Sequence, residues 1–89
     1  MKSHTTKRFR TALSELPKEV REKARESYRQ FREDSYHPSL HFKQVHPAKP
    51  IYSVRVTIGY RAVGILERSE IVWFWIGSHE AYERLITQL

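Results

Sequence analysis

A run of six apolar residues, 71–76, constrains the fold more than any other feature of the sequence, which reads Ile-Val-Trp-Phe-Trp-Ile there. All six are β-branched or aromatic, and these residue types are enriched in strands. Because no polar residue alternates with them, the run predicts a central strand that is covered on both faces. Gly77 ends the run, and Ser78 is a favourable N-cap for a helix over residues 79–86.

His79 falls at the junction between this strand and this helix. A central strand that ends there delivers a titratable side chain to the edge of the sheet, beside a helix N-terminus. This position makes His79 the first candidate for chemistry. The same residues are also consistent with a plain turn that leaves His79 on the surface, and position alone does not separate the two interpretations.

The size and composition of the chain limit the number of domains and the kinds of site that it can contain. Eighty-nine residues with 39% hydrophobic content predict one domain over residues 1–89 with a modest core. The sequence has no cysteine, which excludes disulfides and thiolate metal sites. No apolar segment is long enough to span a membrane, and the first residues lack the apolar core of a signal peptide. We therefore expect a soluble, cytoplasmic protein that does not bind membranes.

The net charge of +6 favours an anionic partner such as a nucleic acid. The basic excess lies in residues 1–16 and 35–68. Residues 17–34 are nearly balanced, so we interpret their charges as the solvated face of a helix.

Two helices are predicted in the first third of the chain. The first is capped by Thr5 or Thr6, and Pro17 separates it from a second helix that extends to about Glu33. Each has one apolar stripe at helical spacing, formed by Phe9, Ala12, Leu13 and Leu16 and by Val20, Ala24, Tyr28 and Phe31. We expect an antiparallel helical hairpin laid on a sheet.

The remaining sequence predicts strands. Residues 40–45 indicate a short strand, and residues 51–58 and 60–66 alternate as a hairpin that turns at Gly59. Only residues 1–5 precede the first helix, without apolar alternation, so a strand there is expected to be short or absent. The predicted fold class is α+β: a two-helix hairpin packed on one side of a twisted, mainly antiparallel sheet of about four strands, with a short C-terminal helix.

His37, His41 and His46 raise the possibility of a metal site. Pro38 between the first two argues against the helical i, i+4 geometry of zinc sites, and no carboxylate is suitably spaced. We therefore expect no metal and no other cofactor.

A candidate reactive cluster follows from the predicted strand order. Neighbouring antiparallel strands bring Lys43, Arg55 and Arg61 to a common basic surface if their faces agree, and His79 and Tyr82 follow the next strand. Arginine holds phosphates, histidine moves protons near neutral pH, and tyrosine stacks on bases. Because RNA carries its own nucleophile, the 2′-OH, such a cluster suits RNA cleavage without a metal. The same pattern also describes many modules that only bind.

Three segments resemble the RelE/ParE superfamily of small bacterial toxins. Residues 51–64, IYSVRVTIGYRAVG, are similar to the family hairpin, in which a Tyr-x-Val/Ile-Arg strand turns into Tyr-Arg-x-Val/Ile. Residues 40–45, LHFKQV, stand where the family has the strand before that hairpin. Residues 75–82, WIGSHEAY, resemble the family's Gly-x-His/Arg ending with an aromatic residue shortly after it.

The resemblance implies a toxin that a co-encoded antitoxin neutralises. Members of the RelE branch cut mRNA in the ribosomal A site, so the ribosome and mRNA are the expected partners. The family's substrate-contacting residues map onto Arg61, His79 and Tyr82, which become the expected catalytic group. The expected RNA-binding residues lie on the strands and on the first helix: Lys43, Arg55, Lys7 and Arg10.

Two alternatives remain open. The ParE branch poisons DNA gyrase without cutting RNA, and its members share the hairpin. A relative of the same fold that is only a non-catalytic protein-interaction domain is the other alternative.

Overall fold

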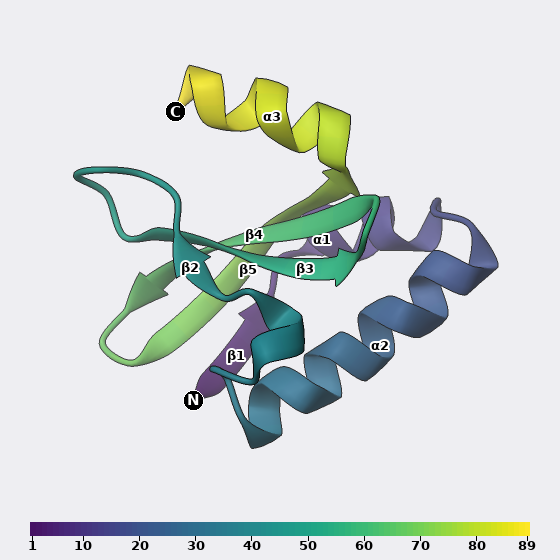
Figure 1. Ribbon diagram of the computed structural model, residues 1–89, viewed down its shortest axis with the longest axis horizontal. Helices are drawn as coiled ribbons and strands as arrows, with labels where there is room; N and C mark the ends of the chain where they lie inside the picture. The colour runs from purple at the N-terminus through teal and green to yellow at the C-terminus, as the bar shows by residue number, and fades with distance from the viewer.

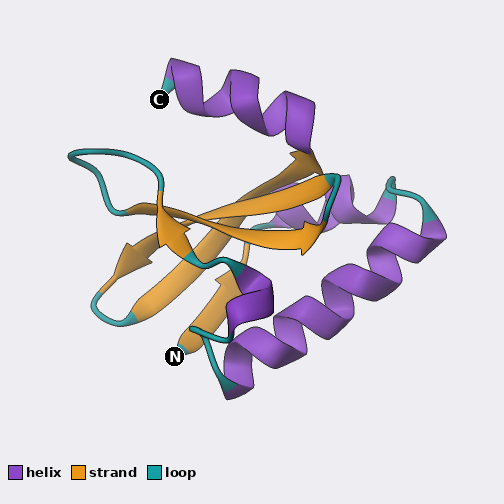
Figure 2. Ribbon diagram, viewed as in Figure 1, coloured by secondary structure: helices purple, strands orange, loops and turns teal.

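The computed structural model describes residues 1–89, which form one five-stranded sheet flanked by helices (Figures 1 and 2). The strand order is β1-β5-β4-β3-β2. β1 runs parallel to β5, and all other neighbours are antiparallel. The strands, in the order of the sheet, are β1 (Lys2–Thr5), β5 (Glu70–Ser78), β4 (Tyr60–Glu67), β3 (Ile51–Thr57) and β2 (Lys43–Gln44).

Two helices, α1 (Lys7–Ser14) and α2 (Lys18–Glu33), cover one face of the sheet as expected. α1 begins where the hydroxyl of Thr6 accepts a 3.1 Å hydrogen bond from the amide of Phe9. Pro17 is the N-cap of α2. The apolar stripes of both helices pack on the sheet in the larger of two core clusters, which includes Phe9, Val20, Ala24 and Phe31 from the helices and Val54, Val56, Ile71 and Trp73 from the strands. None of the helices combines the length and the apolar character needed to cross a membrane.

The third helix, α3 (His79–Gln88), follows β5 directly and belongs to a separate core cluster. Ser78 caps it as predicted, because its hydroxyl accepts a 3.1 Å hydrogen bond from the amide of Ala81. Tyr82 packs with Ile51 and Val63, whose side chains face away from α1 and α2. The helices therefore do not all lie on one side of the sheet, and Figure 1 shows α3 and α2 on opposite sides of it.

The apolar run 71–76 is confirmed as part of a central strand covered on both faces. Ile71 and Trp73 contribute to the core under α1 and α2, whereas Phe74 and Trp75 pack toward α3. The pairing of β4 with β5 shifts register after Val63. Two consecutive aromatic residues of β5, Phe74 and Trp75, therefore pack in the same core cluster. The absence of alternation in the sequence follows from the cover on both faces.

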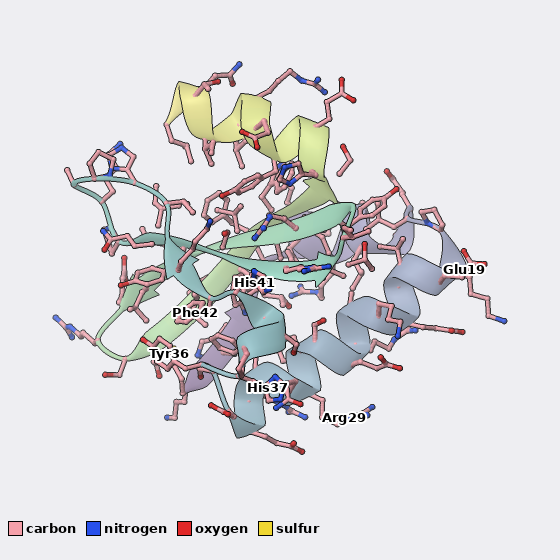
Figure 3. The ribbon with its side chains drawn as sticks, in the orientation of Figure 1. Glu19, Arg29, Tyr36, His37, His41 and Phe42 are labelled. Carbon is pink, nitrogen blue, oxygen red and sulfur yellow. The ribbon has the colours of Figure 1, made fainter.

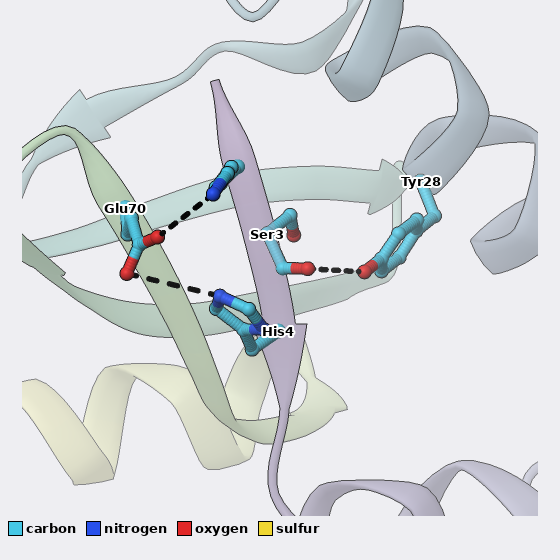
Figure 4. Close-up of polar contacts among 5 residues, drawn as sticks. Ser3, His4, Tyr28 and Glu70 are labelled. Atoms are coloured by element: carbon cyan, nitrogen blue, oxygen red, sulfur yellow. Dashed lines mark hydrogen bonds and ion pairs between the residues drawn. The ribbon is translucent and has the colours of Figure 1, made fainter.

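A strand was expected to be short or absent before the first helix, and the structure has β1 there. It pairs in parallel with β5, from Lys2 opposite Glu70 to Thr5 opposite Trp73. Two contacts from distant residues hold Ser3. Its hydroxyl lies 2.8 Å from Nε1 of Trp73. Figure 4 shows the other contact, in which its carbonyl lies 3.0 Å from the hydroxyl of Tyr28. The sheet therefore has five strands, where about four were expected.

The strand predicted over residues 40–45 is mostly absent. Pro38 starts a 3₁₀ turn, η1 (Pro38–Leu40), and His41 follows with a left-handed backbone at φ 48°. Since a strand cannot pass through that conformation, β2 consists of only Lys43 and Gln44. β3 is consequently unpaired on its outer edge beyond Ser53.

Candidate active site and basic surface

Arg61 lies in the middle of the sheet, on the face that α3 covers. On β4 it stands opposite Arg55 of β3 and opposite Gly77 of β5. Residues opposite one another on paired strands share a face, so Arg55 and Arg61 place two positive charges side by side. Neither guanidinium forms an ion pair with a carboxylate.

Tyr82 joins Arg61 to His79. The guanidinium carbon of Arg61 lies 5.4 Å from the centre of the Tyr82 ring, which is a cation–π distance. The His79 ring stacks on the same tyrosine, with ring centres 5.8 Å apart and planes inclined by 30°. The three residues predicted as a catalytic group therefore form one contiguous cluster, with the tyrosine at its centre.

The ring of Tyr82 is buried, with 4% of its surface exposed. Its hydroxyl lies 3.4 Å from the hydroxyl of Ser53, a long distance for such a hydrogen bond. The predicted role of Tyr82 as a platform for a base does not fit this position, because the ring offers no open face. In this fold Tyr82 instead fixes the places of Arg61 and His79.

One nitrogen of Arg61, Nη1, is buried and has no hydrogen-bond partner within the protein. An unsatisfied buried donor costs about 1–3 kcal/mol, and more when the group is charged. An anionic group that reached this nitrogen would satisfy it. Because the nitrogen is buried, an external anion reaches it only when a neighbouring side chain moves aside.

His79 is the first residue of α3, and about half of its side chain is exposed. Its Nε2 lies 3.1 Å from a carboxylate oxygen of Glu83, one turn along the helix. Its backbone amide donates a 2.8 Å hydrogen bond to the carbonyl of Gly59, in the turn between β3 and β4. The imidazole is therefore positioned on a fixed backbone and remains accessible to solvent.

The predicted RNA-binding residues divide between the two faces of the sheet. Lys43 stands opposite Ser53, two positions from Arg55, so it shares the face of Arg61. Arg55 also lines a groove beside Lys23 of α2, because β3 has a free edge there. Lys7 and Arg10 belong to α1 and lie on the opposite face, so the structure does not bring them to this cluster.

One residue of the cluster, Ser53, was not anticipated from the sequence, whereas acidic residues near His79 were expected. Ser53 is fully buried beside Tyr82, although its type predicts exposure. Glu83 pairs with His79. The i, i+4 spacing of His79 and Glu83 on a helix indicates that their side chains can meet. Nothing in the sequence indicates that Ser53 contacts Tyr82, which lies 29 positions away.

Two of the three histidines considered as metal ligands, His37 and His46, form separate hydrogen bonds. Figure 3 shows His37 and His41 around η1, where Nδ1 of His37 lies 2.8 Å from the hydroxyl of Ser39. Nδ1 of His46 accepts hydrogen bonds from the amides of Ala48 and Lys49. No three His, Asp or Glu side chains converge at any place in the structure.

Several solved structures share this fold. The RelB–RelE antitoxin–toxin complex of Methanococcus jannaschii contains a chain with a TM-score of 0.75 and 14% identity, over 92% of this chain and 96% of that one. YafQ of E. coli has a TM-score of 0.71 and 9% identity, over 90% of this chain and 94% of that one. The YoeB/ParE toxin of Agrobacterium tumefaciens has a TM-score of 0.69 and 15% identity, over 89% of this chain and 99% of that one. The fold is therefore that of the RelE/ParE superfamily of toxins.

A comparison of the sequence with protein families identifies one family within this superfamily. The model of the ParE-like toxin domain matches residues 18–84, and the chain belongs to that family. No curated protein matches the chain by sequence.

Proposed function

We propose that this toxin is a ribosome-dependent endoribonuclease that cuts mRNA and so inhibits translation in the cytoplasm. The observation that carries the proposal is the unpartnered, buried Nη1 of Arg61 beside the exposed imidazole of His79. A guanidinium with a free hydrogen-bond donor and an imidazole that can transfer a proton supply the two functions that phosphodiester cleavage requires.

In this mechanism the 2′-OH of the RNA attacks the adjacent phosphorus, and the bond to the 5′-oxygen of the next nucleotide breaks. The products are a 2′,3′-cyclic phosphate and a 5′-hydroxyl. His79 takes the proton of the 2′-OH or delivers a proton to the leaving 5′-oxygen. Arg61 neutralises the charge that grows on the phosphate, and Tyr82 acts as a positioning residue.

Lys43 and Arg55 extend the positive charge along the same face toward β2. In the proposal they hold the RNA strand on the β2 side of the scissile phosphate, through its backbone. An mRNA in the ribosomal decoding site offers such an extended single strand.

The direct test is a toeprint of an mRNA on programmed ribosomes with purified protein. The wild type should cut within the A-site codon, and Arg61→Ala and His79→Ala should each reduce the cutting at least 100-fold. Arg84→Ala, on the outer surface of α3, serves as the control and should cut like the wild type. Full cleavage by His79→Ala would remove that residue from the chemistry.

A second candidate function is inhibition of DNA gyrase, which the match to the ParE-like family model favours. It predicts no mRNA cuts and a loss of gyrase supercoiling when the protein is added. A non-catalytic interaction domain predicts neither effect and normal growth of cells that express the protein alone.

An antitoxin is part of the proposal, because two matched structures are RelB–RelE complexes. The basic charge of this chain fits an acidic or amphipathic segment of such a partner, and the association should weaken with salt.

A further inference from the structure

Trp75 of β5 is a large aromatic residue that is only partly buried, on the sheet face that carries Arg61. It stands opposite Val63 of β4, which packs with Tyr82 in the core cluster beneath α3. Arg61 lies two positions before Val63 on the same strand, so the side chains of Arg61 and Trp75 share one face of the sheet. Trp75 is therefore an aromatic neighbour of the proposed site on its β5 side.

The indole of Trp75 lies along its own strand, over the glycine that faces Arg61. Gly77 stands opposite Arg61, and a Cβ added to Gly77 would lie 2.7 Å from Cζ2 and 2.8 Å from Cη2 of Trp75. Opposite residues of antiparallel strands have Cβ atoms about 4.5–5.5 Å apart. The indole thus fills the place beside Arg61 that a side chain at position 77 would take. Arg61 is flanked by Trp75 on one side and by Tyr82 on the other.

The two tryptophans of β5 differ in the use of their indole nitrogens. Trp73 is 3% exposed, and its Nε1 donates a 2.8 Å hydrogen bond to the hydroxyl of Ser3. Nε1 of Trp75 forms no hydrogen bond within the protein, and it is not buried, because Nη1 of Arg61 is the only buried side-chain nitrogen or oxygen without a partner. A tryptophan N–H that is buried in a core is usually paired. Trp75 instead keeps a free donor at an open edge of its ring.

The path of α3 explains why Trp75 stays accessible and Tyr82 does not. α3 begins at the end of β5 and runs toward the loop after β2, where the carbonyl of Leu89 lies 3.0 Å from Nε2 of His46 (Figure 1). Tyr82 lies beneath the helix and is 4% exposed. Trp75 packs at the margin of the same cluster and is only partly buried. Of these two aromatic residues beside Arg61, Trp75 is the one with surface available to a ligand.

The chemistry of this face changes from one strand to the next. Arg55 on β3 and Arg61 on β4 suit phosphate groups. On β5 the neighbouring position is the uncharged indole of Trp75, and the two basic side chains of β1 beyond it each lie 3.8 Å from Glu70 (Figure 4). Unpaired positive charge therefore ends beside an aromatic ring. This arrangement fits a nucleotide, in which one ribose joins a phosphate to a base.

We propose that Trp75 is the base-stacking residue of this toxin: its indole holds the base of a single-stranded RNA nucleotide whose phosphate lies at Arg61. Two positions along a strand are about 6–7 Å apart, which is comparable with the distance from a phosphate to the base of the same nucleotide. Aromatic stacking accepts every base, because each base has a π-face. The proposal rests on the proposed function. It gives Trp75 the role of base platform, which the burial of Tyr82 precludes for that residue.

The test compares two single-stranded RNA hexanucleotides in titrations that follow the tryptophan fluorescence of the protein and, separately, the anisotropy of a dye on the RNA. Both strands carry 2′-O-methyl riboses, so no 2′-OH can attack and binding is measured without cleavage. The second strand lacks the bases at its two central positions and keeps every phosphate. The wild type should bind the complete strand at least 10-fold more tightly than the abasic strand, with quenching of its fluorescence.

Trp75→Leu should bind the two strands with affinities that agree within 3-fold, because only the shared phosphates then hold them. Trp75→Phe keeps an aromatic ring and should restore a preference of about 5-fold or more, without quenching, since only the buried Trp73 remains. Tyr36→Leu removes an exposed aromatic ring outside the site and should keep the preference of the wild type. Each variant is compared on two strands, so a change in stability alone does not alter the ratio, and far-UV circular dichroism checks the fold.

Several results would overturn the proposal. They are equal affinity of the wild type for the two strands, no binding of either strand, and an undiminished preference in Trp75→Leu. An equal loss of preference in Tyr36→Leu would do the same. If Trp75→Leu lost only the binding of an acidic helical peptide and kept its preference for the complete strand, the indole would belong to a protein interface instead.

The experiment also separates this proposal from the proposed function. Arg61→Ala should keep the preference for the complete strand while it fails to cut mRNA on ribosomes, because both strands lose the same phosphate contact. A preference that depends on Trp75, in a protein that never cuts mRNA, would leave this proposal standing and remove the nuclease. Normal cutting by Trp75→Leu with its preference intact would do the reverse.

Discussion

The hydroxyl of Tyr28 on α2 donates a 3.0 Å hydrogen bond to the backbone carbonyl of Ser3 on β1 (Figure 4). β1 is an edge strand of four residues, held on one side by β5. Tyr28 therefore fastens the outermost strand to the helical layer, at a carbonyl that is partly buried.

Tyr28→Phe removes this bond and leaves the ring in place. We expect the free energy of unfolding to fall by about 1 kcal/mol, the usual net value of one such hydrogen bond. Amide hydrogen exchange should accelerate in residues 2–5 more than in β4. Tyr36→Phe is the control, because its side chain is exposed and its hydroxyl forms no hydrogen bond within the protein. Equal destabilisation by both changes would contradict the role of the Ser3 contact.

Gly64 lies where β4 and β5 change register, and it has no room for a side chain. An added Cβ would lie 2.8 Å from the indole of Trp73 and 2.9 Å from the carbonyl of Val72. Since the carbonyl belongs to the backbone, Gly64→Ala should cost about 1–3 kcal/mol of stability. Gly59→Ala is the matched control: nothing lies within 4 Å of its Cβ, so its midpoint in a urea titration should stay close to that of the wild type. A small effect at Gly64 would show that the strands can separate locally.

Tyr82 can be tested as a positioning residue with two substitutions. Tyr82→Phe keeps the ring between Arg61 and His79 and loses only the long contact with Ser53, so mRNA cutting should stay within about 3-fold. Tyr82→Leu removes the aromatic contacts, and the cutting rate should fall at least 10-fold with little change in RNA affinity. A large loss in RNA affinity with either change would instead support direct contact with the substrate.

Glu83 places a negative charge beside the proposed RNA-binding face, 3.1 Å from His79. Glu83→Gln should tighten binding of single-stranded RNA several-fold at low salt, because it removes a repulsive charge. The cutting rate should fall at the same time if Glu83 orients the imidazole. Glu80→Gln removes an equal charge from a residue that pairs with Arg84 instead, and its effect on RNA affinity should be smaller. Identical affinities for the two variants would contradict this expectation.

Local patterns in the sequence were sufficient for much of the fold. The uninterrupted run of 71–76 predicted the central strand, and Thr6 and Ser78 predicted the starts of two helices. The alternation of the hairpin brought Arg55 and Arg61 to one surface only if their faces agreed, and the register shows that they do. Each of these features depends on neighbours within a few residues.

The features that sequence patterns missed depend on distant contacts or on unusual backbone angles. β1 is polar, and its partners Trp73 and Tyr28 lie far along the chain. The positive φ of His41 shortened a strand that the residue types favoured.

The candidate site was only partly predictable for the same reason. The order of elements indicated that Arg61 and His79 would come close together. Nothing indicated that Tyr82 would be buried between them, because that depends on which face of the sheet α3 covers.

The parallel pairing of β1 with β5 has a consequence for synthesis of the protein. Ser3 and Trp73 are 70 residues apart, so the sheet cannot be completed until β5 has left the ribosome. The chain must close a loop of that length before β1 and β5 can pair. The entropy cost of that closure slows folding. Until β5 arrives, His79 and Arg61 cannot be brought together. A nascent chain of this toxin therefore lacks its proposed reactive cluster until β5 and the residues that follow it have emerged from the ribosome.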